Sequence, residues 1–571
     1  MRSAAERVAS VLPPTLLFGG AALLVIARWQ MGEPPGFAAR PWEATALLYA
    51  AAAAALACAA VFPLRGPAVA LALTAGWAAL VIAWLEPVPA AAVAGGTALM
   101  IGALGEFARR LTRPPRRRPL AGLALQAALL LAATVAGLRV YDAYLGPTHP
   151  SSEVRLLPAD LVAWAWAGAV TDTGFRVTAA LTAEGRRAAA SHPVQLIVAP
   201  EAGGPATVVE AARISEAGVA AFDVSGLDPG RRYRWTVAIG RADAARSGVV
   251  TTFPRGPASF RVAFGACAST GSNGRVFDRI REDSPLLFIH TGDFHYEDIR
   301  RNDPGAIRTA FAQSLAAPAQ QALWLAVPVA YTWDDHDYGG NDSARTTRSR
   351  PAARAVYREI VPHYPLPGRE ADGPISQAFS IGRVRVIITD SRSERDPSSA
   401  PDGPGKSMLG PGQLQWLFDE LLSARDTHAL TLWVNSVPWI SSSTGGDDWG
   451  AYADERRRIA DFLVEHGITN LVMLSGDAHM LAADDGSNNR FASDGSGPGF
   501  PVLQAGALDR RGSVKGGPYS EGAFPGGGQY GLLDVRDLGD RIEIDFRGRD
   551  WTGRDVLSFT RTFQVLPPAG R

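Results

Sequence analysis

Four short segments, far apart in the chain, place potential metal ligands directly after apolar runs. Their sequences are Phe-Gly-Ala-Cys at 264–267, Thr-Gly-Asp-Phe-His-Tyr-Glu at 291–297, Trp-Asp-Asp-His-Asp at 333–337 and Ser-Gly-Asp-Ala-His at 475–479. Carboxylate oxygens suit Ca²⁺, Mg²⁺ or Mn²⁺, whereas Cys, Tyr and His suit a transition metal such as iron. Polynuclear sites of this mixed kind activate water and hold a phosphoryl group in line for attack. The segments therefore indicate a polynuclear metal site.

The apolar runs that precede these ligands must position them. They cover 261–265, 286–290, 327–333 and 470–475. Apolar runs of about 4–8 residues that end in glycine or polar residues are typical of buried strands. Ligands of open α/β sheets collect outside the carboxyl ends of such strands. We therefore expect the four strand ends to converge on one rim.

The region of 258–571 is predicted to be one large α/β domain. Helical spacing is found at 274–283, 304–324, 350–360, 411–424 and 452–466. Short strands are expected near the end of the chain, at 501–505, 531–535, 541–546 and 558–565, and they suggest a second sheet beside the first. The Gly- and Pro-rich stretches at 484–500 and 510–530 are expected to be loops over the site.

A small β-sandwich is predicted before this domain, at 155–256. Apolar and polar residues alternate there at strand period, between turns such as Asp-Thr-Gly and Asp-Pro-Gly. Tyr233 follows a tight turn and precedes an alternating strand, which suits a tyrosine corner. Trp164, Trp166 and Trp235 are expected in its core. We find no chemistry in this segment and interpret it as a spacer or lid.

The first 145 residues are predicted to form an all-α membrane domain. Five apolar stretches of spanning length lie at about 8–27, 44–62, 67–85, 88–105 and 119–138. The whole chain has 571 residues with 56 basic and 56 acidic side chains, so its formal net charge of zero offers no argument for a nucleic-acid partner. The lipid bilayer is the partner that the sequence indicates.

Basic residues give the orientation of the predicted spans. Six arginines separate the fourth span from the fifth: Arg109, Arg110, Arg113, Arg116, Arg117 and Arg118. By the positive-inside rule this loop is cytoplasmic. The N-terminus is then cytoplasmic too, and everything after about residue 140 lies outside the plasma membrane of what we expect to be a bacterium. An alternative for Arg117-Arg118 is a twin-arginine export signal, which would place the same domain outside.

Each ligand candidate also has a plain structural interpretation. The chain has two cysteines, Cys58 and Cys267, so a disulfide framework is not expected, and a lone buried thiol is usually inert. His290, one residue inside its strand, is interpreted as a packed histidine. Four ligand motifs at four strand ends favour the metal site over these interpretations. A serine hydrolase and a zincin are disfavoured, because neither Gly-x-Ser-x-Gly nor His-Glu-x-x-His occurs.

The four motifs, in this order and spacing, resemble PhoD-type alkaline phosphatases of the metallophosphoesterase superfamily. The segments at 409–417 (Leu-Gly-Pro-Gly-Gln-Leu-Gln-Trp-Leu) and 433–439 (Trp-Val-Asn-Ser-Val-Pro-Trp) fit the same family. The resemblance covers about 160–565 and does not extend to the five predicted spans. It implies an α/β two-sheet sandwich flanked by helices, preceded by a β-sandwich, and phosphomonoesterase and phosphodiesterase activity.

The resemblance also implies a set of site residues. Cys267, Asp293, Tyr296 and His479 are similar to iron (Fe³⁺) ligands, and Asp293 would bridge to calcium, with Asp334 and Asp477 as further ligands. Mn²⁺, Mg²⁺ or Zn²⁺ are alternative ions. Asp335 and His336 are expected beside the ions, with His336 contacting the substrate phosphate or protonating the leaving oxygen. Asn435 falls where related phosphoesterases place a histidine ligand, and we group it with the catalytic residues.

The sequence therefore predicts a membrane-anchored, outward-facing phosphoesterase that hydrolyses phosphate mono- or diesters with metal-activated water or hydroxide. Two alternatives stay open. Tethering beside the membrane also suits a phosphodiesterase acting on phospholipids or wall polymers. A non-catalytic, metal-stabilised sensor is the third possibility, and its weakness is that every expected ligand is present. The natural substrate, the oligomeric state and the use of the membrane domain beyond anchoring are not predicted.

Overall fold

The computed structural model describes residues 161–240, 246–367, 372–442, 446–495 and 497–565. The five predicted spans and their arginine loop lie before residue 161, outside the described residues. Within the described ranges, no helix has both the length and the apolar character needed to cross a bilayer.

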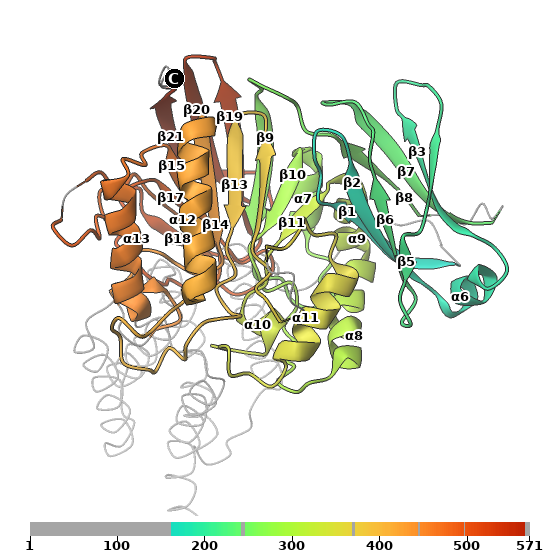
Figure 1. Ribbon diagram of the computed structural model, residues 1–571, viewed down its shortest axis with the longest axis horizontal. Helices are drawn as coiled ribbons and strands as arrows, with labels where there is room; N and C mark the ends of the chain where they lie inside the picture. The colour runs from blue at the N-terminus through green and yellow to red at the C-terminus, as the bar shows by residue number, and fades with distance from the viewer. Residues whose placement is uncertain (1–160, 241–245, 368–371, 443–445, 496, 566–571) are drawn as a thin grey trace, which may run out of the picture. The chain divides into compact units, whose positions relative to one another are not determined.

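Three sheets organise the described residues (Figure 1). The first has ten strands in the order β21-β20-β19-β9-β10-β11-β1-β2-β6-β5. In chain order these are β1 (Val162–Gly168), β2 (Phe175–Leu181), β5 (Arg213–Ile214), β6 (Val219–Val224), β9 (Phe260–Gly265), β10 (Leu287–His290), β11 (Val329–Tyr331), β19 (Gln529–Asp537), β20 (Arg541–Asp550) and β21 (Asp555–Gln564).

The second sheet has seven strands in the order β12-β13-β14-β15-β17-β16-β18. They are β12 (Gln377–Ile381), β13 (Val384–Ile388), β14 (Leu430–Asn435), β15 (Leu471–Ser475), β16 (Met480–Asp484), β17 (Val502–Ala505) and β18 (Ala523–Pro525). The third sheet, in the order β4-β3-β7-β8, consists of β3 (Val194–Pro200), β4 (Thr207–Glu210), β7 (Arg232–Ile239) and β8 (Arg246–Thr251).

The strands β1–β8 and α6 (Ala183–Ala189) lie in the region where the sequence predicts a small β-sandwich. Trp235 is buried in its core, as expected. The expectation is wrong for Trp164 and Trp166, which pack in the apolar cluster under the helices of the α/β domain, where Trp166 contacts Phe294 and Trp324. The Tyr233 hydroxyl accepts a hydrogen bond from the Asp228 amide at 2.9 Å, which confirms the tyrosine corner. One half of the sandwich continues into the ten-stranded sheet, because β1 pairs in parallel with β11.

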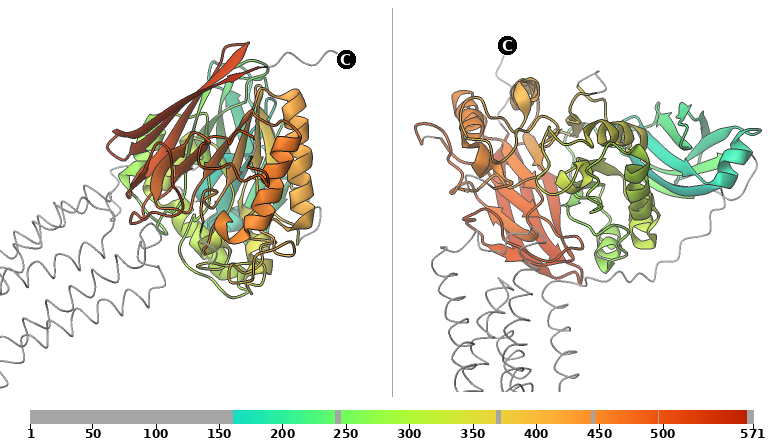
Figure 2. Two further views of the ribbon diagram at one scale, coloured as in Figure 1. Left: turned by 90° about the vertical axis from the view of Figure 1, so that its left-hand side faces the viewer. Right: turned by 90° about the horizontal axis from the view of Figure 1, so that it is seen from below.

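The two large sheets pack face to face, with helices outside both. Val262, Leu287, Leu432 and Val472, two from each sheet, belong to one buried apolar cluster between them. The other face of β9–β11 is covered by α7 (Arg275–Glu282), α8 (Pro304–Ala316), α9 (Pro318–Ala326) and α11 (Arg350–Ile360). The outer face of β13–β15 is covered by α12 (Gly410–Thr427) and α13 (Ala453–Glu465) (Figure 2). This arrangement is the multi-sheet α/β sandwich predicted for the region.

Two details of the predicted fold are wrong. The single helix expected at 304–324 is two helices, because Ala317 before Pro318 is extended, with ψ 127°. The strands expected near the end of the chain do not form a sheet of their own. β17 joins the seven-stranded sheet beside β15, whereas β19–β21 extend the first sheet through pairing of β19 with β9. Pairing between strands that are distant in the sequence leaves no signal in neighbouring residues. The sequence pattern therefore could not predict which sheet each of these strands joins.

Candidate active site

The predicted strand ends meet at one rim between the two large sheets. β9, β10 and β11 are parallel neighbours, as are β14 and β15, so their carboxyl ends lie on the same side of each sheet. The backbones approach closely there: a Cβ on Gly292 would come within 2.4 Å of Asp334 Cβ, and Gly292 has φ +113°. A Cβ on Gly476 would come within 2.5 Å of Thr291 Oγ1. Glycine at these two positions lets the ligand-bearing turns pack together.

The four residues that resemble iron ligands form one contact cluster. Cys267 Sγ lies 3.5 Å from Asp293 Oδ2, and the Tyr296 hydroxyl donates to the same oxygen at 2.7 Å. The Tyr296 oxygen also lies 3.3 Å from His479 Nε2. His479 Nδ1 is 2.7 Å from the Arg511 carbonyl oxygen, which can only accept, so Nδ1 carries the proton and Nε2 presents its lone pair to the cluster. One thiol, one carboxylate, one phenol and one imidazole therefore converge.

Strained backbone places three of the predicted ligands. Cys267, Asp293 and Asp477 have φ values of +65°, +56° and +62°, in the left-handed region that side-chain-bearing residues rarely adopt. Such strain concentrates at functional sites, where the surrounding structure holds it in place. Asp477 is buried, and its carbonyl oxygen lies 3.7 Å from Cys267 Sγ, so the turn after β15 packs against the turn after β9.

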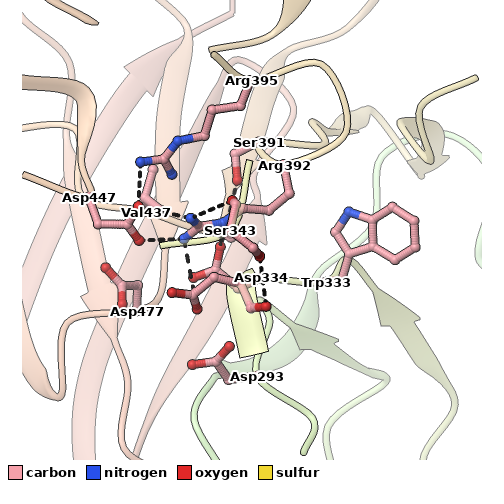
Figure 3. Close-up of polar contacts among 12 residues, drawn as sticks. Asp293, Trp333, Asp334, Ser343, Ser391, Arg392, Arg395, Val437, Asp447 and Asp477 are labelled. Atoms are coloured by element: carbon pink, nitrogen blue, oxygen red, sulfur yellow. Dashed lines mark hydrogen bonds and ion pairs between the residues drawn. The ribbon is translucent and has the colours of Figure 1, made fainter. Parts of the chain in front are cut away.

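Asp334 is buried at the end of β11 with its two oxygens in different environments. Oδ1 accepts from Arg392 Nε at 2.5 Å and from Ser436 Oγ at 2.7 Å (Figure 3). Oδ2 is buried and has no hydrogen-bond partner. A buried carboxylate oxygen without a partner is costly unless a cation or a donor meets it. Asp334 can therefore offer one oxygen to a metal ion while the other is held by the protein.

Asp335 and His336 begin the short helix α10 (Asp335–Tyr338) beside Asp293. Single ligand atoms of Asp293, Asp335 and His336 lie within 4.8 Å of one another. His336 Nδ1 is 2.5 Å from Asp298 Oδ1, so this nitrogen is occupied and Nε2 is the ring atom available for other contacts. Burial lowers the pKa of His336, but the neighbouring carboxylates outweigh burial and raise that pKa to about 10.

Asn435 ends β14 and is completely buried. Its Nδ2 donates to the Val437 carbonyl oxygen at 2.5 Å, which fixes the amide, and its Oδ1 has no hydrogen-bond partner. The next residue, Ser436, contacts Asp334 directly. Asn435 Oδ1 is thus a second buried oxygen acceptor in the same region, which suits a metal ligand as well as the catalytic role predicted from the sequence.

The acidic groups of the rim are buried and lie close to one another. Burial raises the pKa of Asp293 well above its ordinary range, and Asp335 and Asp334 add to this increase while His336 opposes it. Burial also raises the pKa of Asp334, against the effect of Arg392. Ionised carboxylates in such surroundings require a cation nearby. The donor types and the two unpartnered oxygens therefore fit metal ions.

Comparison with known proteins finds a similar family. Residues 262–513 match the family model described as PhoD-like phosphatase. Alkaline phosphatase D of Bacillus subtilis (strain 168) is 24% identical over 306 residues, which cover 45% of this chain and 52% of that protein. This chain thus spans about half the length of that relative.

The likeness of fold extends beyond residues 262–513. A solved structure described as "Structure of PhoD" superposes with a TM-score of 0.60 at 19% sequence identity. The superposition covers 72% of this chain and 92% of the chain in that structure. At this identity the likeness establishes the fold alone. It covers a larger part of the chain than the family match does.

The sequence interpretation missed several residues of the site. Arg392 is not among the predicted site residues, yet it is completely buried and pairs with both Asp334 and Asp447. Arg395 also pairs with Asp447. Arg392 follows the apolar run 384–388 and Thr-Asp-Ser, the same strand-end pattern that identified the four motifs. A search for every such strand end would have found it.

Proposed function

We propose that this chain is a metal-dependent phosphoric ester hydrolase that acts on phosphate monoesters or diesters. The observation that carries the proposal is the convergence of Cys267, Asp293, Tyr296 and His479 beside the half-occupied carboxylate of Asp334. The match of residues 262–513 to the family model described as PhoD-like phosphatase supports the same reaction class.

Two kinds of ligand set are available for the metal ions. Cys267, Tyr296 and His479 with Asp293 would hold an iron-type ion, because thiolate, phenolate and imidazole suit transition metals. Asp334, Asp477 and Asn435 would hold a harder ion such as calcium, and Mn²⁺, Mg²⁺ or Zn²⁺ are alternatives. When bound, such ions polarise the phosphoryl oxygens and lower the pKa of water, which is the chemistry that ester hydrolysis needs.

The remaining residues of the rim would hold the catalytic groups in place and donate a proton to the substrate. His336 is held through Nδ1 by Asp298, so a proton on Nε2 can be donated to the leaving oxygen of the ester. Asp335 accepts from the His336 amide at 2.9 Å and from the Asp342 amide at 2.7 Å, which fixes the turn that carries the imidazole. Arg392 and Ser436 bind Oδ1 of Asp334, so Oδ2 is the oxygen that would bind an ion.

Activity of the purified full-length protein tests this proposal. We expect hydrolysis of an aryl phosphate ester, its loss with a chelator and its recovery when metal ions are returned. Asp293→Asn should abolish activity and bound metal together, whereas Asp223→Asn, an exposed change in the sandwich, should alter neither. A metal-loaded protein that is inert towards both mono- and diesters would favour the sensor interpretation instead.

We also propose that the enzyme is anchored in the plasma membrane and faces outward. The five apolar stretches and the arginine-rich loop at 109–118 support this arrangement. A reporter that works only outside the cytoplasm, fused after residue 150, is expected to be active. Activity of a cytoplasm-restricted reporter at the same junction would contradict the orientation.

A further inference from the structure

Asp337 is a buried carboxylate that connects two of the turns carrying predicted ligands. It is 3% exposed. Its Oδ2 accepts a hydrogen bond from the Asp334 amide at 3.2 Å, and its Oδ1 accepts one from the His295 amide at 3.0 Å. His295 lies between Asp293 and Tyr296, which are both predicted ligands. One carboxylate therefore joins the turn after β10 to the turn after β11.

The two hydrogen bonds of Asp337 have different origins. Asp337 is the third residue of α10, and Asp334 is the residue that precedes this helix. A bond between these two positions belongs to a capping box, which stabilises the start of a helix. The bond from His295 spans 42 positions of the chain and is no part of the cap. Helix capping therefore accounts for only one of the two oxygens.

A second carboxylate makes the reverse connection between the same turns. Asp293 Oδ1 accepts from the His336 amide at 3.3 Å. Asp293 is also a predicted ligand, so metal ions would compete for its oxygens. The bonds of Asp337 involve no predicted ligand atom. Asp337 can therefore hold the two turns together whether or not metal ions are bound.

Asp337 differs from Asp334 in what its oxygens are free to do. Asp334 has one oxygen held by Arg392 and Ser436, and its buried Oδ2 has no hydrogen-bond partner. Both oxygens of Asp337 accept from backbone amides. The first arrangement suits a carboxylate that binds an ion. The second suits a carboxylate that holds the backbone in place.

We propose that Asp337 is a positioning residue that fixes the Asp293–Tyr296 turn relative to Asp334, and thereby sets the distance between the two metal positions. The inference rests on the proposed phosphoesterase function and its two ligand sets. Two ions can hold the attacking and leaving oxygens in line only at a suitable separation. A displacement of about 1 Å in a reacting group can cost about 100-fold in rate.

Substitution of Asp337 in the full chain tests this inference. Asp337→Asn keeps the size, but its amide oxygen can accept only one of the two bonds, and its NH₂ group faces the other backbone amide. The kcat for p-nitrophenyl phosphate should fall about 10- to 100-fold with little change in KM, the loss typical of groups that support metal ligands. Asp337→Glu keeps both acceptor oxygens on a longer side chain and should recover part of the loss.

Glu455→Gln is the matched control. Glu455 lies in α13 and is 1% exposed, and its two oxygens accept from the amides of Met408 and Leu409 at 3.2 and 3.0 Å. This variant also loses one backbone hydrogen bond to a buried carboxylate, but it lies away from the predicted ligands. Its unfolding free energy should fall as in Asp337→Asn, and its kcat should equal that of the wild type.

Two further readouts separate positioning from a purely structural role. The visible absorption of the iron-loaded protein should shift in Asp337→Asn, because Tyr296 lies on the displaced turn, and should stay unchanged in Glu455→Gln. In the wild type, the His295 and Asp334 amides should exchange hydrogen slowly with and without metal ions. This measurement needs no variant, so it decides the connection even if Asp337→Asn does not fold.

Three results would overturn the inference. These are a loss of stability in Asp337→Asn with kcat and absorption unchanged, an equal loss of kcat in Glu455→Gln, and fast exchange of the two amides in the metal-loaded wild type. Wild-type protein inert towards mono- and diesters would overturn the proposed function instead. The absorption and exchange measurements would then still decide the role of Asp337.

Discussion

Ion pairs in the small sandwich are exposed to solvent, whereas those at the rim of the large sheets are buried. In the sandwich, Arg232 pairs with Glu201, and the two side chains are 55% and 31% exposed. At the rim, Arg392 pairs with Asp334, and these side chains are 0% and 1% exposed. Exposed pairs contribute little to stability, whereas buried charges are expensive unless each is compensated. The sandwich therefore tolerates loss of its ion pairs, and the rim depends on its charges being matched.

Other polar groups show the same contrast. The buried Tyr233 hydroxyl of the sandwich accepts a hydrogen bond from Asp228. Asp334 Oδ2 and Asn435 Oδ1 at the rim are buried without hydrogen-bond partners. In addition, three predicted ligands at the rim have left-handed backbone conformations. The rim thus combines strained backbone with buried oxygens that have no partner, which a binding site can use. In the sandwich, the buried Trp235 Nε1 also has no partner, but a donor such as this cannot bind a cation.

The largest difference between the two regions should come from truncating one arginine in each. Arg392→Ala leaves Asp334 as an uncompensated buried charge and Asp447 with Arg395 as its remaining ion-pair partner, and we expect it to lower the free energy of unfolding by about 3–5 kcal/mol. Arg232→Ala, its control in the sandwich, should cost less than about 1 kcal/mol. Urea-induced unfolding followed by tryptophan fluorescence measures both. Equal losses would remove the contrast.

The next effect concerns the metal ions. Cys267→Ser keeps an oxygen donor but loses the ionisable sulfur, so iron affinity should fall by at least about 10- to 100-fold, the loss typical of changes around metal ligands. The visible absorption of an iron–thiolate–phenolate centre should change, and the fold should be retained by the other ligands. Metal analysis and the absorption spectrum check this. Unchanged iron content and activity would make Cys267 an ordinary buried thiol.

A smaller effect should appear in the pH dependence of stability. Burial raises the pKa of Asp509 to about 7, against the effect of a hydrogen bond from Ser272. Because this pKa is higher in the folded than in the unfolded chain, the carboxyl group stays protonated to a higher pH in the folded state. The stability of the metal-free wild type relative to Asp509→Asn should therefore fall by about 1.4 kcal/mol per pH unit as the pH rises from about 4 to 7. A constant difference across that range would show that Asp509 ionises normally.

The smallest effect is expected in the sandwich. Tyr233→Phe removes the hydroxyl that accepts from the Asp228 amide, and it should cost about 0.5–1.5 kcal/mol of unfolding free energy. Hydrolysis and metal content should be unchanged, because the hydroxyl contacts the sandwich and not the rim. Calorimetric unfolding and the aryl ester assay measure the two quantities. Loss of activity in this variant would show that the sandwich is coupled to the site.

The local sequence pattern was enough to predict helices, strands and candidate ligands of this protein. The helix predicted at 350–360 has the bounds of α11, and each predicted ligand-bearing run coincides with a strand, because length, apolar character and end signals are properties of neighbouring residues. His290 was interpreted as a packed histidine, and it is buried among Phe288, Phe294 and Tyr331. The ligand candidates could be recognised in the same way, because a polar motif directly after an apolar run involves only a few neighbouring residues.

Only the tertiary structure decided which distant segments became partners. Arg392 and Asp334 are 58 residues apart, and their pairing depends on how the second sheet packs against the first. The division of the last strands between two sheets, the contacts of Arg510 and His336 with the Tyr296 ring, and the single available oxygen of Asp334 have the same origin. Side-chain partners across a core are chosen by packing and burial, which act between segments that share no local pattern.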